Sequence, residues 1–101
     1  MTGRARVASV KDTAEALRSL SASVAERARR SVVLGPDGCL LSTYRRRGMA
    51  PQFKWTGADG EVYLMYHWRV YMYIVEGIIP PPHDVRRICP HPQCVNPDHR
   101  L

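Results

Sequence analysis

The predicted fold depends most on one stretch near the C-terminus, Arg87-Ile-Cys-Pro-His-Pro-Gln-Cys-Val-Asn-Pro-Asp-His-Arg-Leu101. It contains two cysteines with four residues between them, and four more residues separate the second cysteine from a histidine. The loop between the cysteines is short and carries two prolines, so both sulfur atoms can converge on one point. Zinc prefers thiolate and imidazole ligands in a tetrahedral arrangement. The spacing therefore predicts a zinc knuckle (the loop from Cys89 to Cys94) in which Cys89, Cys94 and His99 are three of the ligands.

The residues after the second cysteine carry a helix-start signal. Asn96 is a preferred N-cap residue, Pro97 is tolerated at the first helical position, and Asp98 suits the positive end of the helix dipole. We therefore expect a helix to start at Asn96, with His99 on its first turn and facing the metal.

A fourth ligand has to come from elsewhere in the chain. Cys39 is the only other cysteine, and we expect it to complete the site. Two alternatives stay open: Cys39 is a buried core residue, or the site is closed by His91 or His83. A third alternative is that the three cysteines are unrelated free thiols. Three cysteines argue against a secreted disulfide framework and fit a reducing compartment in which thiolates bind metal.

The length and net charge of the chain limit the number of domains, the compartment and the kind of partner that we expect. A chain of 101 residues suits one small domain with a modest core, which a metal would help to stabilise. No apolar signal core follows the basic start, and the most apolar run, residues 70–79, is too short to span a bilayer, so we expect a soluble cytoplasmic protein with no membrane partner. The net charge of +6 suits a polyanion such as DNA or RNA, although many small basic domains bind nothing in particular.

The N-terminal third is predicted to contain one helix. Residues 1–11 resemble a disordered lead, and Asp12-Thr-Ala-Glu15 is a capping-box-like start. From there to residue 30 the chain lacks Pro and Gly and is rich in Ala, which predicts an amphipathic helix over 12–30. Its apolar stripe is thin, so it packs lightly on the rest of the chain or pairs with a partner helix. We divide the chain into a tail and helix (1–31) and a zinc domain (32–101).

The middle of the chain predicts strands and a second helix. Alternating apolar and polar residues on either side of a Gly-containing turn indicate a β-hairpin, and a longer aromatic run ending at Gly77 favours a helix. The predicted elements are a strand at 39–44, hairpin strands at 52–56 and 61–65, a helix at 66–76 and a short strand at 84–88. The predicted class is small α+β, with a two- or three-stranded antiparallel unit, a central helix and a zinc knuckle.

Several short motifs occur in a particular order along this chain. They are Gly38-Cys39, the hairpin at 52–65, His67-Trp68-Arg69, Gly77-Ile78-Ile79-Pro80 and the stretch from Cys89 to His99. This order resembles the zinc-bearing, phage-type branch of the HNH and His-Cys-box endonucleases and covers about residues 37–101. The resemblance implies a ββα-metal fold and a structural zinc held by Cys39, Cys89, Cys94 and His99. Four protein ligands leave no open position for water, so zinc-hydroxide chemistry is not expected.

The sequence departs from the nuclease pattern at the catalytic positions. Those nucleases have a general-base histidine two residues before the first knuckle cysteine, where this chain has Arg87. A guanidinium cannot accept a proton at neutral pH. The family's later ligand for a catalytic divalent metal has no counterpart here, so Mg or Mn is expected only if nuclease activity is retained. His67 matches the helix-opening histidine and is the candidate substitute base, whereas His83 and His91 are less well placed.

These observations favour a zinc-stabilised, HNH-like module that binds nucleic acid, with DNA as the expected partner, and has no nuclease activity. The residues expected to contact phosphate are Arg45, Arg46, Arg47, Arg69, Arg86 and Arg87. One alternative is an active metal-dependent HNH DNA endonuclease with a rearranged site, acting as a homodimer. The other is a protein-interaction module resembling a phage effector, which contacts a host enzyme through residues 12–30. For a phage protein, the expected compartment is the host cytoplasm.

Overall fold

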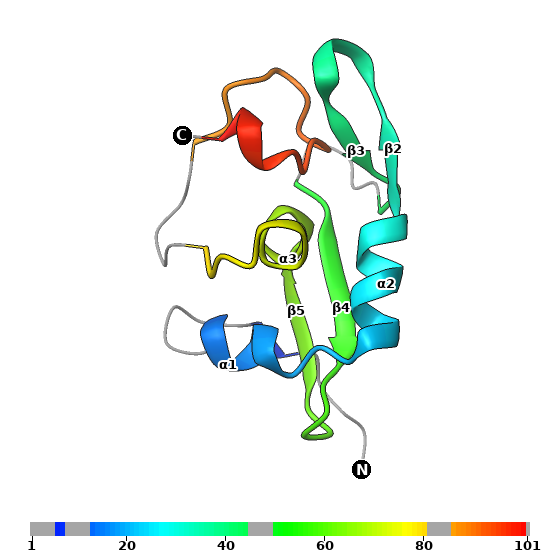
Figure 1. Cartoon of the computed structure of the whole chain (residues 1–101), viewed down its shortest axis with the longest axis vertical. Helices are drawn as coiled ribbons and strands as arrows, with labels where there is room; N and C mark the ends of the chain where they lie inside the picture. Colours follow the sequence, from blue (N-terminus) through cyan, green and yellow to red (C-terminus); the bar gives the residue numbers. More distant parts are fainter. Residues whose placement is uncertain (1–5, 8–12, 45–49, 81–85, 101) are drawn as a thin grey trace.

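The computed structural model describes residues 6–7, 13–44, 50–80 and 86–100 (Figure 1). The elements follow in the order β1 (Arg6–Val7), α1 (Thr13–Arg18), α2 (Ala22–Arg30), β2 (Val32–Leu34), the 3-10 turn η1 (Pro36–Gly38), β3 (Leu40–Ser42), β4 (Gln52–Thr56), β5 (Val62–Tyr66), α3 (His67–Glu76) and the 3-10 turn η2 (Pro97–His99). This arrangement confirms the predicted α+β class. The β2–β3 hairpin and the C-terminal segment lie at one end of the molecule, and the β4–β5 turn lies at the other.

The predicted central hairpin is confirmed. Strands β4 and β5 are antiparallel, with Phe53 opposite Met65 and Trp55 opposite Tyr63. These four side chains are buried, whereas Lys54 between them is exposed. The alternation that predicted the hairpin therefore directs its aromatic side chains into the core.

Helix α3 follows β5 directly and ends where the sequence predicted. Gly77 has a φ of +69°, in the left-handed region, and its N–H donates to the Tyr73 carbonyl at 2.9 Å. A residue with a Cβ atom is strained in this conformation, so glycine is the residue that suits this helix end. The helix turns Trp68, Val70 and Met72 inward.

The single helix predicted over 12–30 is wrong, because α1 and α2 are separate. Two serines explain the break. The Ser19 hydroxyl donates to the Ala16 carbonyl at 2.5 Å, and the Ser21 hydroxyl accepts from the Val24 N–H at 3.3 Å as the N-cap of α2. Serine hydroxyls compete with backbone groups for hydrogen bonds, which makes them weak inside helices and strong at caps.

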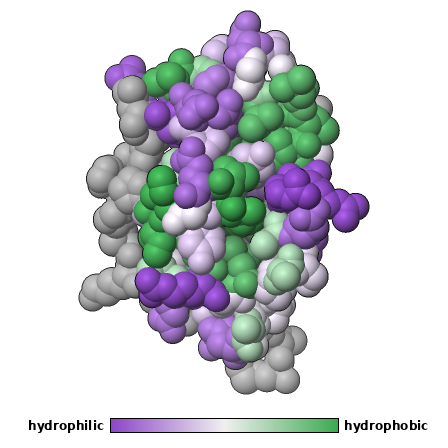
Figure 2. Space-filling model, in the orientation of Figure 1, coloured by the Kyte–Doolittle hydropathy of each residue, from purple (hydrophilic) through white to green (hydrophobic). Residues whose placement is uncertain are grey.

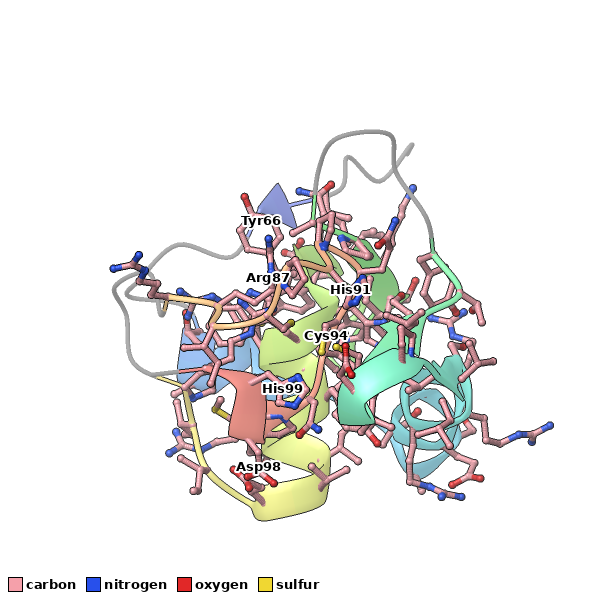
Figure 3. The ribbon with its side chains drawn as sticks, turned by 90° about the horizontal axis from the view of Figure 1, so that it is seen from above. Tyr66, Arg87, His91, Cys94, Asp98 and His99 are labelled. Carbon is pink, nitrogen blue, oxygen red and sulfur yellow. The ribbon has the colours of Figure 1, made fainter. Side chains whose placement is uncertain are left out.

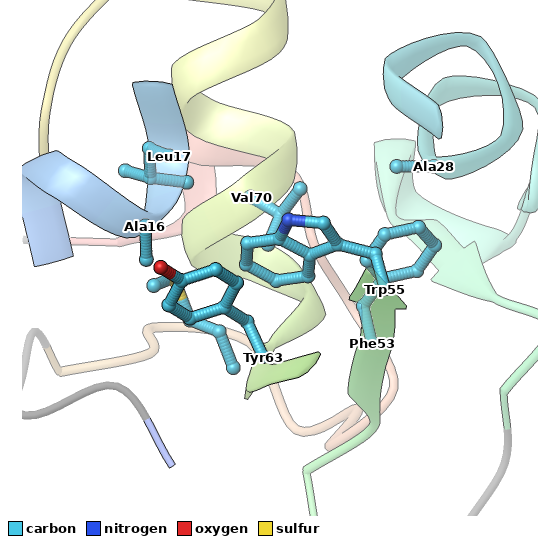
Figure 4. Close-up of a cluster of buried hydrophobic side chains, with 8 residues drawn as sticks. Ala16, Leu17, Ala28, Phe53, Trp55, Tyr63 and Val70 are labelled. Atoms are coloured by element: carbon cyan, nitrogen blue, oxygen red, sulfur yellow. The ribbon is translucent and has the colours of Figure 1, made fainter. Parts of the chain in front are cut away.

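The main hydrophobic core draws on both helices, the hairpin and α3 (Figure 4). Its buried members are Ala16, Leu17, Ala28, Phe53, Trp55, Tyr63, Met65 and Val70. Trp55 lies between Phe53 and Tyr63, and its indole N–H donates to the Ser19 hydroxyl at 3.2 Å. The domain boundary after residue 31 stays a prediction, but the buried residues on its two sides share one core.

Strands β2 and β3 form a second antiparallel hairpin, and the C-terminal segment pairs with the edge of β3 that faces away from β2. The Ser42 N–H donates to the Gln93 carbonyl at 2.9 Å, and the Val95 N–H donates to the Leu40 carbonyl at 2.7 Å. Leu41 and Cys94 form the backbone bridge between these bonds. The end of the knuckle therefore lies beside β3 like a third strand, close to the turn that carries Cys39.

Two expectations about the remaining chain need correction. The disordered lead over 1–11 is wrong for Arg6–Val7, which pairs in parallel with β5 at Tyr63 and Leu64. The strand expected at 84–88 is reduced, among its described residues, to one bridge between Arg87 and Arg100, because its partners His99 and Arg100 lie in and directly after the 3-10 turn η2 and not in a strand. In the described part of the chain, no helix has the length and apolar character needed to cross a membrane.

Candidate metal centre

The four predicted ligands come from two parts of the chain. Cys39 follows η1 in the turn between β2 and β3, whereas Cys89 and Cys94 bound the knuckle and His99 ends η2. Figure 3 views the molecule from this end, with Cys94 and His99 near the centre. The expected helix start at Asn96 is a single 3-10 turn. The Asn96 side-chain oxygen accepts from the Asp98 N–H at 3.0 Å, which sets the direction in which the turn leaves the knuckle.

The ligand atoms lie close enough together to share one metal ion. All four lie within 4.8 Å of one another. The His99 Nδ1 atom is 3.4 Å from the Cys39 sulfur and 3.5 Å from the Cys94 sulfur. Zinc–sulfur and zinc–nitrogen bonds of about 2.3 and 2.05 Å give a sulfur–nitrogen separation of about 3.5 Å across a tetrahedron. This Cys3His group fits a metal such as zinc, with Nδ1 as the histidine ligand.

The alternative ligands take other roles or lie outside the described residues. Within the described part of the chain, the group that could hold a metal contains Cys39 and leaves out His91. The His91 carbonyl accepts from the Cys94 N–H at 3.0 Å and from the Cys89 thiol at 3.9 Å, so its backbone shapes the knuckle. His83 lies outside the described residues.

The two sides of the site differ in burial and in acidity. Cys39 and Cys94 are buried, whereas Cys89 and His99 are half-buried. Burial raises the pKa of Cys39 to about 12, and the neighbouring Cys94 and Cys89 sulfurs add to this effect. Burial also opposes ionisation of Cys89, but hydrogen bonds with the His91 backbone and with His99 outweigh it and lower the pKa of Cys89 to about 7. Metal ligation requires thiolates, so metal binding here releases protons.

Two arginine side chains hold the backbone of the cysteine ligands. The Arg87 Nε–H donates to the Cys89 carbonyl at 2.7 Å, and the Arg100 Nη2–H donates to the Cys94 carbonyl at 2.8 Å. Sequence reasoning placed Arg87 at a functional position but missed Arg100. The available signal was that a cation directly follows the last metal ligand.

Trp68 forms the second core cluster with Met72 and Val95, and two arginine side chains pack against its ring. The guanidinium carbons of Arg69 and Arg100 lie 4.7 and 4.3 Å from the centroid of the Trp68 ring. Burial lowers the pKa of Arg100 to about 10, and the charge of Arg87 acts in the same direction. Stacking on an indole face offsets part of the cost of burying a guanidinium.

The predicted phosphate contacts differ in accessibility. Arg86 is exposed and Arg87 is half-buried, whereas Arg69 is buried with 8% of its surface exposed. Burial and the Trp68 ring leave Arg69 little surface for a phosphate. The expected basic loop, Arg45 to Arg47, lies outside the described residues.

His67, the candidate substitute base, lies fully inside the core. Its Nε2 atom is 2.9 Å from the Ala28 carbonyl, which can only accept, so Nε2 carries the proton. Its Nδ1 atom then accepts from the Ser42 hydroxyl at 2.7 Å. Burial lowers the pKa of His67, and both ring nitrogens have partners. In this conformation the ring cannot take a proton from a solvent water molecule.

Comparison of the chain with protein-family models, curated proteins and solved structures finds no match.

Proposed function

We propose that this chain is a zinc-stabilised, HNH-like module that binds nucleic acid and does not cleave it. The observation that carries the proposal is the Cys3His group beside Arg87. In the motif order of the resembled nucleases, the metal-binding half of the pattern is retained, and an arginine replaces the general base.

The metal in this proposal is structural. Four protein ligands close a zinc coordination sphere, so no position is left for a reacting water molecule. Cys39 belongs to the β2–β3 turn and the other three ligands belong to the C-terminal segment, so the metal cross-links two parts of the chain that are distant in sequence. Zinc then contributes directly to folding stability.

Two observations favour binding over cleavage. A guanidinium has N–H donors and no acceptor, so Arg87 cannot take a proton from water, and its Nε–H is already committed to the Cys89 carbonyl. His67, the nearest match for a substitute base, is buried with both ring nitrogens engaged. A nuclease would need another base, or a different conformation of His67.

The positive charge favours a polyanionic partner. The formal net charge is +6, and three thiolates with one Zn²⁺ change it by about −1, to roughly +5. Arg86 is exposed, and Arg87 pairs with no carboxylate among the described residues, so both can contact phosphate. Such contacts release counterions, and we expect binding to weaken steeply as salt rises.

A supercoiled-plasmid assay tests the proposal. Zinc-loaded protein is incubated with plasmid in magnesium, in manganese and in EDTA, and nicking and gel shift are read together. A salt-sensitive shift without nicking is expected. Metal-dependent nicking that co-purifies with the protein would favour the nuclease alternative, and the absence of both signals would remove the nucleic-acid proposal.

One observation favours protein contact as a second candidate function. Val33 and Leu34 in β2 are 48% and 79% exposed, and hydrophobic atoms gather near the β2–β3 end of the face in Figure 2. By contrast, Ala16, Leu17 and Ala28 from the predicted helical interface are buried in the chain's own core. Sedimentation of the wild type and of Leu34→Glu tests whether this patch pairs two copies, and a monomer at all concentrations would count against pairing.

A further inference from the structure

We propose that Arg87 and Arg100 together form a binding site for one phosphate-class oxyanion, and that the metal centre positions both arginines. The inference rests on the proposed function for the source of the phosphate, which we take to be a nucleic-acid backbone. It adds Arg100 to the predicted contacts and makes phosphate binding depend on zinc.

The first step is the way in which the two side chains are held. Arg87 and Arg100 are opposite one another in a backbone bridge, and the Ile88 N–H donates to the His99 carbonyl at 2.8 Å beside it. Each guanidinium spends one N–H on the carbonyl of a cysteine ligand. A guanidinium has five N–H donors, so both side chains keep terminal N–H groups for a ligand. Fixed guanidinium groups lose little entropy when they bind an oxyanion.

The second step is that too little negative charge lies near the guanidinium groups of Arg87 and Arg100 to neutralise them. Arg87 and Arg100 pair with no carboxylate among the described residues, and they are opposite one another in the backbone bridge. A Cys3His site with Zn²⁺ carries a net charge of about −1, so the two guanidinium groups and the metal centre sum to about +1. An oxyanion between the arginines would remove this imbalance, and planar guanidinium groups match its oxygen atoms.

The third step is the restraint on the Arg100 side chain. The Nε atom of Arg100 is buried and finds no hydrogen-bond partner in the described chain. The Trp68 ring lies 4.3 Å from the guanidinium carbon of the same side chain. The ring therefore restricts how this guanidinium can turn. Arg100 is thus held in a fixed orientation, and its terminal N–H groups, not the buried Nε, are the donors left for an oxyanion.

The fourth step connects the site to the metal. The carbonyl groups that hold the arginines belong to Cys89 and Cys94, whose sulfurs would ligate zinc. Losing the metal frees the knuckle and with it both guanidinium anchors. Because linkage is reciprocal, zinc should raise the affinity for phosphate and phosphate should raise the affinity for zinc by the same factor.

Fluorescence anisotropy with a short labelled DNA duplex tests the site on the zinc-loaded full chain. The variants are Arg87→Gln, Arg100→Gln and Arg100→Lys, with Arg18→Gln, an exposed arginine of α1, as the matched control. We expect each of the two glutamine variants to weaken binding about 10-fold or more and to reduce the salt slope by about one contact. Arg100→Lys should also weaken binding because it keeps the charge but loses the planar fork, and the control should stay within about 2-fold.

Two further measurements test whether the phosphate must belong to a nucleic acid and whether phosphate binding depends on the metal. Inorganic pyrophosphate is titrated as a competitor and as a direct ligand, and zinc affinity is measured by chelator competition with and without unlabelled duplex. Zinc content and thermal unfolding of every variant show that it is folded.

The possible results distinguish failure of the proposed phosphate site from failure of the proposed nucleic-acid function. Wild-type DNA binding that neither arginine substitution weakens would overturn the inference and leave the function standing. Pyrophosphate binding that both arginine substitutions weaken, without DNA binding, would support the site and remove the nucleic-acid function. Binding of neither ligand would overturn both, and equal zinc affinity with and without bound duplex would overturn the metal linkage.

Discussion

Arg87 and Arg100 meet across a backbone bridge, and each guanidinium donates to the carbonyl of a different cysteine of the candidate metal centre. The position that carries a general base in the resembled nucleases thus holds a side chain that braces the knuckle. The hydrogen bond from Arg87 to the Cys89 carbonyl also keeps a positively charged side chain beside Cys89, whose thiolate would be a zinc ligand. We infer that this end of the molecule combines metal-dependent folding with anion recognition.

Substitution of a single ligand should release the metal. We expect Cys39→Ser and His99→Ala each to weaken zinc binding by more than about 100-fold, because the closed coordination sphere loses one of its four protein ligands. Zinc released from purified protein by thiol modification, read with a chromogenic chelator, measures the stoichiometry. His91→Ala is the matched control, since His91 contributes only backbone contacts to the knuckle, and it should retain one zinc per chain. Loss of zinc from the His91 variant with retention in the Cys39 variant would reverse the ligand assignment.

Removal of the metal should loosen the fold as a whole. Zinc would join the β2–β3 turn to the C-terminal segment, and the backbone bonds of Val95 and Ser42 join the same parts. We expect EDTA to lower the unfolding temperature by at least about 10 °C, followed by recovery with zinc. Thermal unfolding monitored by circular dichroism measures this effect. An unchanged midpoint after verified zinc removal would contradict a structural role for the metal.

Two glycines allow the strain of a turn to be separated from its effect on the metal. Gly38 and Gly60 have φ values of +75° and +84°, so alanine should cost about 1–2 kcal/mol of folding free energy at either position. Only Gly38 adjoins Cys39, and its carbonyl accepts from the Asn96 side-chain amide at 2.8 Å. Gly38→Ala should therefore also weaken zinc binding, whereas Gly60→Ala should leave it unchanged. Urea unfolding and chelator competition give the two quantities, and equal zinc affinities in both variants would show that the turn does not position Cys39.

The N-cap that separates the two N-terminal helices should have a measurable stability effect. Ser21→Ala removes the acceptor for the Val24 N–H and should lower the free energy of unfolding by about 1 kcal/mol. Ser23, two residues later and also exposed, is the control, because its hydroxyl lies 3.2 Å from the Ser21 hydroxyl but accepts from no backbone N–H of α2. Urea unfolding of both alanine variants measures the difference. A loss for Ser23→Ala as large as for Ser21→Ala would rule out a capping effect.

The features that could be predicted from the sequence are those specified by residues close together in the chain. The hairpin follows from alternating burial, as with exposed Lys54 between buried Phe53 and Trp55. The end of α3 follows from the conformational freedom of Gly77, and three ligand positions follow from short spacings. Cys39 could be proposed only by elimination and from the family resemblance, because its approach to the knuckle depends on the pairing of Leu41 with Cys94.

The features that were missed depend on contacts between distant residues. Nothing local marks Arg6–Val7 as a strand, because its partner is β5. The break at Ser19 is stabilised by the hairpin, where the Ala58 N–H donates to the Ser19 carbonyl at 3.0 Å. Arg100 gains its role only when the fold brings Trp68 and the Cys94 carbonyl to it.

His67 should make the folding stability depend on pH. Burial lowers its pKa in the folded state below the unfolded value of about 6.5, so the unfolded chain binds the proton more tightly. The stability contribution is fully present above pH 6.5 and is lost as pH falls toward the folded pKa, with a slope of at most about 1.4 kcal/mol per pH unit. Protonation of Nδ1 would also leave the Ser42 hydroxyl hydrogen without its acceptor. Urea unfolding at pH 7.5, 6.5 and 5.5 measures the slope for the wild type and for His67→Gln, which cannot titrate. Metal ligands titrate in both proteins, so the difference in slope isolates His67, and parallel pH profiles would mean that the buried ring does not control acid stability.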